Sequence, residues 1–259
     1  MGVLNVTPDS FSDGGRFAET EAAIARGLAL VEAGADLIDV GGESTRPGSD
    51  PVPADEQMRR VVPVIATLSR RTEAPISIDT TSAEVARAAL EAGASIVNDI
   101  SAFRFDDAML PLLAATGVPA IAMHTTGPPK TMQREAHYDD VVADVRDHLA
   151  ARLDACVAAG VARTQIVLDP GLGFGKLLSH NLELLRGLSR LAELGRPLLV
   201  GASRKSFLGK LTGKDVDDRL MATAGAVAAS IVLGAHIVRV HDVAELRDAI
   251  RVADAIVRE

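Results

Sequence analysis

The sequence contains one cysteine, five lysines and no long apolar run, and each scarcity excludes a class of protein. A single cysteine, Cys156, excludes an intrachain disulfide and fits a reducing compartment. The most apolar segment, 224–235, is too short and too rich in glycine and alanine to span a bilayer, and no signal peptide opens the chain. A net charge of −8 argues against general affinity for nucleic acid or acidic membranes. We therefore expect a cytoplasmic protein that binds neither.

Nothing divides the 259 residues into separate units. Hydrophobic residues make up 47% of the chain, enough for a large core, and no low-complexity tract, charge block or flexible linker interrupts it. No cluster of histidine, cysteine or carboxylate residues has metal-ligand spacing, so a zinc ion held by the protein alone is not expected. We predict one domain that spans residues 1–259.

A repeating unit runs along the chain. Six times a helical pattern ends in glycine and a short apolar, β-branched run follows within a few residues; these glycines are Gly34, Gly93, Gly117, Gly160, Gly195 and Gly234. Val3–Leu4 and the Ile76–Ile78 run bring the expected strands to eight. Almost wholly apolar strands belong to a parallel sheet covered by helices. The pattern predicts an α/β fold, a single (β/α)8 TIM barrel, with a doubly wound open sheet as the alternative.

The expected helices are amphipathic. One apolar face consists of Val141, Val145, Leu149 and Leu153, and Cys156 continues it, so we predict a core thiol rather than a nucleophile. The last helix has an apolar face that consists of Val243, Leu246, Ile250, Ala253 and Val257.

Barrel enzymes of this kind work at the carboxyl ends of their strands, and here those ends are polar. At or just past the expected strand ends lie Asn5, Glu43, Asp79, Asn98, Asp99, His124, Asp169, Ser203, Lys205, Arg239 and His241. A carboxylate or amide is costly to bury unless something pairs with it. Asp79, Asn98 and Asp169 therefore indicate a pocket for a flat heterocycle with several N–H donors, although each alone also fits a cap or a turn.

The run from Asp169 to Lys176 places three alternate glycines after a buried strand. It differs from a phosphate loop, because Pro170 and Leu177 occupy the positions where that motif requires glycine and a hydroxyl residue. Glycine lets the backbone approach a ligand closely, so we interpret the run as a ligand-facing loop. The alternative is a glycine-rich structural turn.

Two anion sites are expected. Arg239 and His241 precede the last helix, with Asp242 as its expected N-cap, and predict a phosphate or pyrophosphate site. Asn5 is adjacent if the first and eighth strands pair, and its oxygen suits Mg²⁺ that shares its shell with water and phosphates. Lys205 and its neighbours Ser203 and Ser206 start another helix and suggest a carboxylate site, although a solvated basic face also explains the lysines there. We expect covering loops at 7–17 and 41–53.

Several runs together resemble the family of dihydropteroate synthases. They are MGVLNVTPDSFSDGG at 1–15, GESTRPG at 42–48, IDT at 78–80, VND at 97–99, DPGLGFGK at 169–176, SRKSF at 203–207 and RVHD at 239–242. Their order is collinear from the first residue to the last helix. Thr125 departs from the methionine usual in the family. Family members also usually carry a short segment before the first of these runs, so we expect a less covered barrel floor.

The resemblance implies a folate-pathway transferase that condenses 6-hydroxymethyl-7,8-dihydropterin pyrophosphate with para-aminobenzoate, giving 7,8-dihydropteroate and pyrophosphate. Carried over by position, the pterin pocket and catalytic group consist of Asp79, Asn98, Asp169 and Lys205, with Met123 as an apolar wall. The pyrophosphate and Mg²⁺ site consists of Asn5, Arg239 and His241. The aminobenzoate site consists of Phe11, Thr45, Arg46, Pro47, Phe174, Lys205 and Ser206.

The resemblance also implies a dissociative reaction, sulfonamide susceptibility and a homodimer. Two alternatives stay open. A pterin-dependent methyltransferase, which passes a methyl group to a cobalamin protein, would not need the loops at 7–17 and 42–48. A non-catalytic paralogue would bind pterin without condensing it.

Overall fold

The computed structural model describes residues 1–7 and 15–257, without the side chains of residues 15–18 and 135. Among these residues strands and helices alternate. The strands are β1 (Gly2–Asn5), β2 (Ile38–Gly41), β3 (Ile76–Asp79), β4 (Ile96–Asp99), β5 (Ala120–Met123), β6 (Ile166–Asp169), β7 (Leu199–Val200) and β8 (Ile237–Val238). The helices are α1 (Gly15–Glu32), α2 (Ala54–Arg71), α3 (Ala83–Glu91), α4 (Met109–Thr116), α5 (Val141–Ala158), α6 (Leu178–Arg186), α7 (Leu188–Ala192), α8 (Ser206–Thr212), α9 (Leu220–Val232) and α10 (Val243–Val257).

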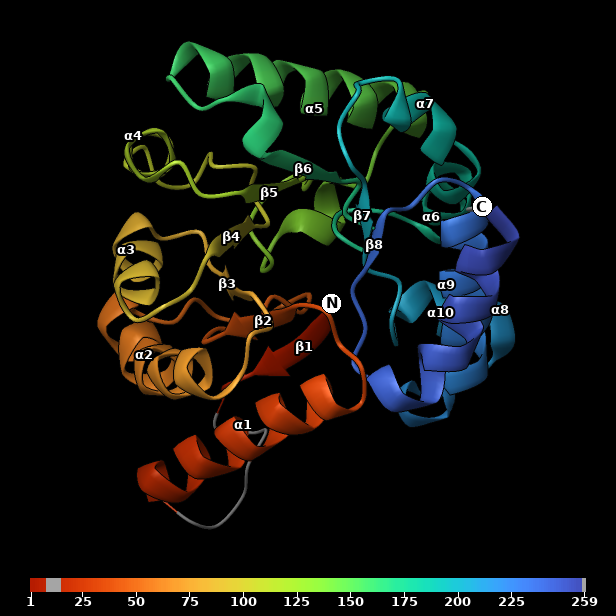
Figure 1. Cartoon of the computed structure of the whole chain (residues 1–259). Coiled ribbons are helices and arrows are strands. Elements are labelled where there is room, and N and C mark those ends of the chain that lie inside the picture. Colours follow the sequence, from red (N-terminus) through yellow and green to blue (C-terminus); the bar gives the residue numbers. More distant parts are fainter. Residues whose placement is uncertain (8–14, 258–259) are drawn as a thin grey trace.

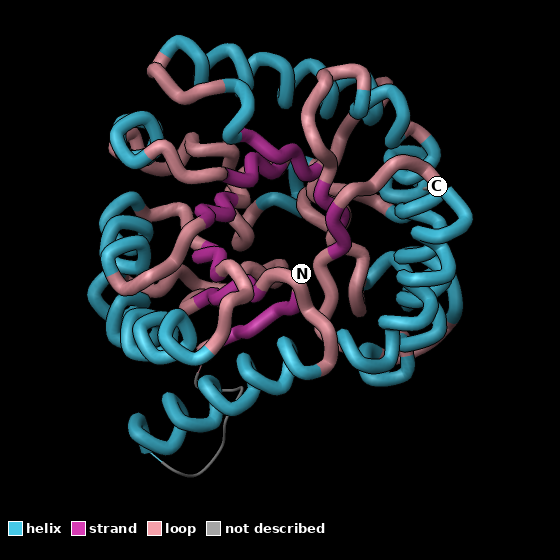
Figure 2. The backbone as a smooth tube through the Cα atoms, in the orientation of Figure 1, coloured by secondary structure: helices cyan, strands magenta, loops and turns pink. Residues whose placement is uncertain are grey.

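The strands surround a central axis and the helices lie outside them (Figures 1 and 2). Strands β1 to β6 form one parallel sheet in chain order, and β7 pairs with β8. Single bridges join these two sheets, Leu168 to Leu198 on one side and Gly2 to Val240 on the other. The predicted barrel is confirmed. It has two seams, between β6 and β7 and between β8 and β1, where one bridge replaces a continuous ladder of backbone hydrogen bonds. The doubly wound alternative is wrong, because its strand order would reverse within the sheet.

Local sequence accounts for the ends of the helices. The six glycines expected to end helices all have left-handed φ values, from +68° at Gly195 to +112° at Gly93. Helix α5 begins after Asp140, whose Oδ1 accepts the backbone N–H groups of Val142 and Ala143 at 3.0 Å. None of the described helices has both the length and the apolar character needed to cross a bilayer.

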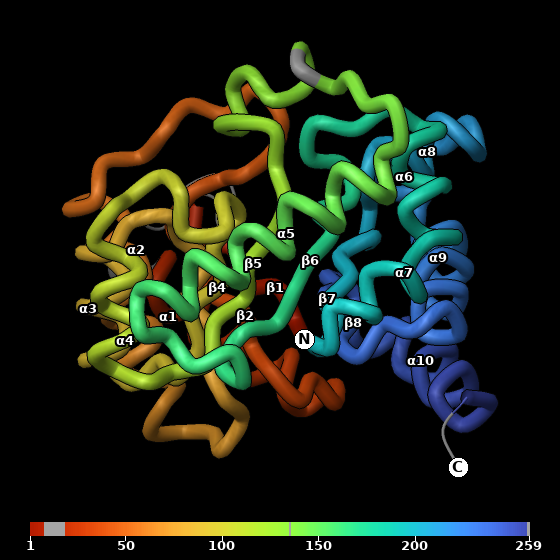
Figure 3. The backbone as a smooth tube through the Cα atoms, turned by 90° about the horizontal axis from the view of Figure 1, so that it is seen from above, coloured from red at the N-terminus to blue at the C-terminus, as the bar shows by residue number. Residues whose placement is uncertain are grey.

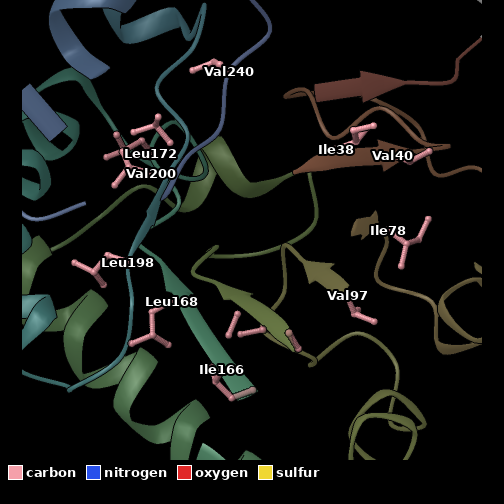
Figure 4. Packing of buried hydrophobic residues seen from close by; sticks show 14 of the residues in the cluster. Ile38, Val40, Ile78, Val97, Ile166, Leu168, Leu172, Leu198, Val200 and Val240 are labelled. Atoms are coloured by element: carbon pink, nitrogen blue, oxygen red, sulfur yellow. The ribbon is translucent and has the colours of Figure 1, made fainter. Parts of the chain in front are cut away.

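The main core lies between the strands and the helices. Alternate strand residues such as Ile38, Val40, Ile166 and Leu168 are fully buried there (Figure 4). Each such side chain stabilises the fold by roughly 1.5–3 kcal/mol. Cys156 is buried with them as predicted, and burial raises the pKa of its thiol to about 11.

One residue of the expected core is exposed, and a cavity lies at the barrel floor, where less cover was expected. The prediction for Val257 is wrong: it is the last residue of α10 and is 41% exposed. At the barrel floor, Met1, Leu37 and Ile237 contribute to the lining of a cavity of about 520 Å³.

At the opposite end the segments after β2 and β5 rise above the strands (Figure 3).

Candidate active site

Polar side chains gather where the strands end. Asn5, Asp79, Met123 and Asp169 are the last residues of β1, β3, β5 and β6. The parallel register aligns Asp79 with Asn98 of β4, and Met123 with Asp169. Aligned residues of neighbouring strands point to the same face. The structure therefore brings together the three residues predicted to face a heterocycle, with Met123 between Asn98 and Asp169 in strand order.

An ion-pair network crosses the barrel at this end. Arg239, which follows β8, donates from Nε to Oδ2 of Asp39 at 2.6 Å and from Nη2 to Oδ2 of Asp79 at 2.8 Å. Asp39 in β2 is fully buried, and its Oδ2 also accepts from Nδ2 of Asn98 at 3.1 Å. Burial, and next the charge of Asp39, raise the pKa of Asp79 to about 7, although Arg239 opposes this. Arg239 thus links the predicted pyrophosphate site to Asp79 of the predicted heterocycle pocket.

Oδ1 of Asp39 in this network has no hydrogen-bond partner among the described residues, and three oxygen atoms of the predicted heterocycle pocket likewise have none. They are Oδ1 of Asp79, Oδ1 of Asn98 and Oδ2 of Asp169. The other carboxylate oxygen of Asp169 accepts the backbone N–H of Gly171 at 2.7 Å. Burial raises the pKa of Asp169, and the charge of Lys205 is the largest effect that lowers it. A molecule with several N–H donors would satisfy all three oxygens.

Lys205 directly precedes α8 and supplies a cation to the site. Its Nζ donates to the carbonyl oxygen of Leu172 and lies 4.6 Å from the centre of the Phe174 ring. Burial lowers the pKa of Lys205 to about 8, and the charge of Asp169 opposes this most strongly. Lys205 is therefore mainly protonated at pH 7, in cation–π contact with Phe174.

The loop after β6 is held at four successive carbonyl groups. Lys205 Nζ donates to the carbonyl oxygen of Leu172, and Gln133 Nε2 donates to the carbonyl oxygen of Gly173 at 2.6 Å. Lys176 Nζ donates to the carbonyl oxygen of Phe174 at 2.9 Å, and the Tyr138 hydroxyl donates to the carbonyl oxygen of Gly175 at 2.9 Å. Glycine is required at 171, where φ is +67° and a Cβ would lie 1.9 Å from the carbonyl oxygen of His124. The loop is therefore preorganised, and it carries Phe174 into contact with Lys205.

Lys176 is buried behind this loop. Its Nζ lies 2.9 Å from Nδ1 of His124, just past the end of β5. Burial lowers the pKa of Lys176 well below its usual value, and burial followed by the charge of Lys176 lowers the pKa of His124. A neutral His124 accepts at Nδ1 from Lys176, so the pair fixes the loop to the end of β5.

The predicted pyrophosphate residues lie beside the ion-pair network. Nδ1 of His241 lies 3.0 Å from Oγ of Ser203, which also accepts the backbone N–H of His241 at 3.2 Å. Burial, and next the charge of Arg239, lower the pKa of His241 to about 4. The imidazole is therefore neutral at pH 7. Asp242 directly precedes α10 as expected, and its carboxylate binds the guanidinium of Arg204.

Asn5 offers a single oxygen ligand for a metal. Its side chain has no hydrogen-bond partner within residues 1–7 and 15–257. A Cβ on Gly41 would lie 3.8 Å from both Oδ1 of Asn5 and Oδ2 of Asp79, so these two side chains flank that glycine. No group of three histidine, cysteine or acidic residues in the described part could hold a metal ion. Mg²⁺ does not require such a cage, because it keeps waters and substrate phosphate oxygens, and Asn5 fits that role.

The residues predicted to hold an aminobenzoate come from separate loops. Thr45, Arg46 and Pro47 lie between β2 and α2, and Arg46 is near enough for its charge to lower the pKa of His241. Glu43 holds this segment, because its carboxylate accepts from the backbone N–H of Val52 at 2.8 Å and from Gln57 Nε2 at 3.2 Å. Ser206 is the first residue of α8 and is exposed. Phe11 lies outside the described residues.

Sequence reasoning missed two buried residues that organise this site, Asp39 and Lys176. Asp39 had a signal, because it is an acid in the middle of an otherwise apolar strand. Side chains alternate along a strand, so the Asp39 side chain lies on the same face as Gly41, toward the inside of the barrel. No sequence signal indicated the role of Lys176, because its hydrogen-bond partner His124 is 52 positions away along the chain.

Comparison with known proteins agrees with this arrangement. Residues 1–241 match the family model described as pterin binding enzyme. The chain is similar to the dihydropteroate synthase of Synechocystis sp., with 47% identity over 259 residues that cover 100% of this chain and 90% of that protein.

Two solved structures are similar throughout. The Xanthomonas albilineans dihydropteroate synthase with 4-aminobenzoic acid has a TM-score of 0.93 and 46% identity, covering 100% of this chain and 92% of that one. The Yersinia pestis dihydropteroate synthase with a sulfonamide drug has a TM-score of 0.93 and 43% identity, covering 98% and 92%. With matches of this extent, the chain belongs to the dihydropteroate synthase family of pterin-binding enzymes.

Proposed function

We infer that this chain condenses 6-hydroxymethyl-7,8-dihydropterin pyrophosphate with para-aminobenzoate to give 7,8-dihydropteroate and pyrophosphate. The observation that carries this function is the group of three acceptor oxygens on Asp79, Asn98 and Asp169. A pterin ring offers N–H donors that match such acceptors. The family relationship supports the same reaction.

Asp169 has the central electrostatic role in this proposal. The reaction breaks the bond between the exocyclic methylene carbon and a pyrophosphate oxygen and forms a bond from that carbon to the aminobenzoate nitrogen, which loses a proton. Positive charge develops on the pterin ring as pyrophosphate leaves. An ionised Asp169 that accepts from ring N–H groups stabilises that charge, and Asp79 and Asn98 hold the ring in register.

Arg239, His241 and Asn5 receive the leaving group in this proposal. The Ser203 hydroxyl accepts a backbone N–H and can donate to Nδ1 of His241, which leaves Nε2–H as a neutral donor to a phosphate oxygen. Arg239 retains Nη1 for the same purpose, since its ion pairs with Asp39 and Asp79 use Nε and Nη2. Mg²⁺ held by Asn5 would neutralise charge on the pyrophosphate oxygens.

The aminobenzoate lies between Phe174 and the loop after β2 in this proposal. Phe174 supplies an apolar face, and Lys205 and Ser206 supply a cation and a hydroxyl for the carboxylate. Thr45, Arg46 and Pro47, together with Phe11, complete the site as the family resemblance implies. Because a sulfonamide is bound in the Yersinia pestis relative, we propose the same susceptibility here.

Three further proposals concern the whole chain. Residues 1–259 act as one domain, supported by two sheets whose strands follow chain order and which single bridges join on both sides. A homodimer is supported by exposed apolar side chains on α9 and α10, of which Met221 is 79% and Ile256 71% exposed. A cytoplasmic location is supported by the free buried thiol of Cys156.

Pyrophosphate release, measured with and without para-aminobenzoate, tests the reaction. Release that requires the aminobenzoate and yields dihydropteroate is expected. A methyltransferase or a binding-only paralogue would bind the pterin and release no aminobenzoate-dependent pyrophosphate.

Asp169→Asn tests the role of that carboxylate. We expect turnover to fall by roughly 100-fold, as for loss of a charge-stabilising group, while pyrophosphate affinity changes by less than about threefold. Equal losses in turnover and in pyrophosphate affinity would contradict the role.

A further inference from the structure

Asp39 is a buried carboxylate that the proposed reaction does not use directly. It is 0% exposed and lies in β2 one layer below Gly41. Its Oδ2 accepts from Arg239 at 2.6 Å and from Asn98 at 3.1 Å, whereas its Oδ1 has no partner among the described residues. An acid so far from solvent is costly unless its contacts have a purpose.

The contact with Asn98 decides which way that amide faces. A carboxylate can only accept hydrogen bonds, so Asn98 must turn its NH₂ group toward Asp39. Its carbonyl oxygen then faces away from Asp39, and no described residue donates to it. A free asparagine could present either a donor or an acceptor to a ligand, whereas this one presents an acceptor only.

The contact with Arg239 likewise fixes the orientation of a side chain, the guanidinium of Arg239. Asp39 and Asp79 together occupy Nε and Nη2, so the guanidinium is held in one orientation across β8, β2 and β3. We infer that Asp39 is a positioning and specificity-determining residue: it fixes Asn98 and Arg239 so that this edge of the pocket accepts hydrogen bonds, and so selects a heterocycle that presents N–H donors there. This inference deepens the proposed function and rests on it.

Asp39→Asn tests the inference, with Asp36→Asn as the matched control. Asp36 is an exposed acid three residues earlier, just before β2 starts, so the control makes the same chemical change away from the site. We expect Asp39→Asn to raise the Kd and KM for dihydropterin pyrophosphate by roughly 10- to 100-fold, with the KM for para-aminobenzoate changed by less than about twofold. The control should match the wild type in all three.

Asn98→Asp provides a second test that does not depend on the folding of the first variant. It keeps an acceptor oxygen for the ligand but loses the donor to Asp39. We expect pterin affinity to fall by at least about tenfold because two carboxylates then face each other.

The outcomes separate the two claims. Unchanged pterin affinity in Asn98→Asp, or equal losses for both substrates in a folded Asp39→Asn, would each overturn the role of Asp39. Calorimetry gives these affinities without turnover. A wild type that binds dihydropterin pyrophosphate but releases no pyrophosphate would therefore refute the proposed reaction while the Asp39 result still holds.

Discussion

Gly171→Ala is the sharpest test of the preorganised loop after β6. Gly171 has φ +67°, and a Cβ there would lie 1.9 Å from the carbonyl oxygen of His124. Real Cβ atoms essentially never come closer than 3.0 Å to such an atom, so loop and strand end must separate by roughly 1 Å. That movement also breaks the hydrogen bond that Gly171 donates to Asp169 at 2.7 Å.

Gly195→Ala isolates the conformational part of the cost. Gly195 has φ +68°, and a Cβ added there would meet no atom within 4 Å, so alanine at this position has only the left-handed strain of about 1 kcal/mol. Gly171→Ala has the same strain and in addition loses a hydrogen bond to a carboxylate, worth about 1.5–3 kcal/mol. Its free energy of unfolding should therefore fall by about 2 kcal/mol more than that of the control.

Urea denaturation and steady-state turnover check both parts of this prediction. A displacement of roughly 1 Å in an active site reduces turnover by about 100-fold, so Gly171→Ala should lose most activity while Gly195→Ala keeps it. If Gly171→Ala were as stable and as active as Gly195→Ala, the loop would have room to adjust and the preorganisation would be refuted.

Two further predictions concern pH. Because burial lowers the pKa of Lys205 to about 8, kcat/KM for para-aminobenzoate should decline above that pH as the ammonium loses its proton, and Lys205→Arg should move the decline to higher pH; an identical profile in both would assign the decline to another group. The raised pKa of Asp79, about 7, means that the native state binds more protons than the unfolded state between about pH 4 and 7, so the Asp79 contribution to stability falls as pH rises through that range. Asp79→Asn should therefore gain stability relative to wild type across this range in thermal melts, and a constant difference would contradict the shift.

The barrel could be predicted from the sequence because its signals are local. Gly34 or Gly117 ends a helix through its own backbone freedom, and the strand that follows is apolar because both of its faces are buried. Strand-end residues such as Asp79 and Asp169 could be assigned to one rim as soon as the strands were parallel, since register alone aligns them.

The partners of these residues could not be predicted in the same way. Arg239 contacts Asp39 across 200 positions, and nothing in either segment indicates the other. The neutral state of His241 likewise depends on burial and on cations from other elements, including Arg204 and Arg46. Val257 continues the helical spacing of the apolar face of α10, but its 41% exposure depends on tertiary packing that this spacing does not encode.

The seam between β1 and β8 gives Arg239 a second importance. Among the described residues, β1 and the β8 segment are joined by the single Gly2–Val240 bridge and by the hydrogen bond from the Met1 amino group to the Val238 carbonyl oxygen at 3.0 Å. Arg239 reaches from the β8 side to acids on β2 and β3. The guanidinium therefore links strands across one of the two seams, in addition to its proposed contact with the departing anion. Removing it weakens the architecture and the chemistry together, so kinetic losses at this position measure both until the variant's stability is known.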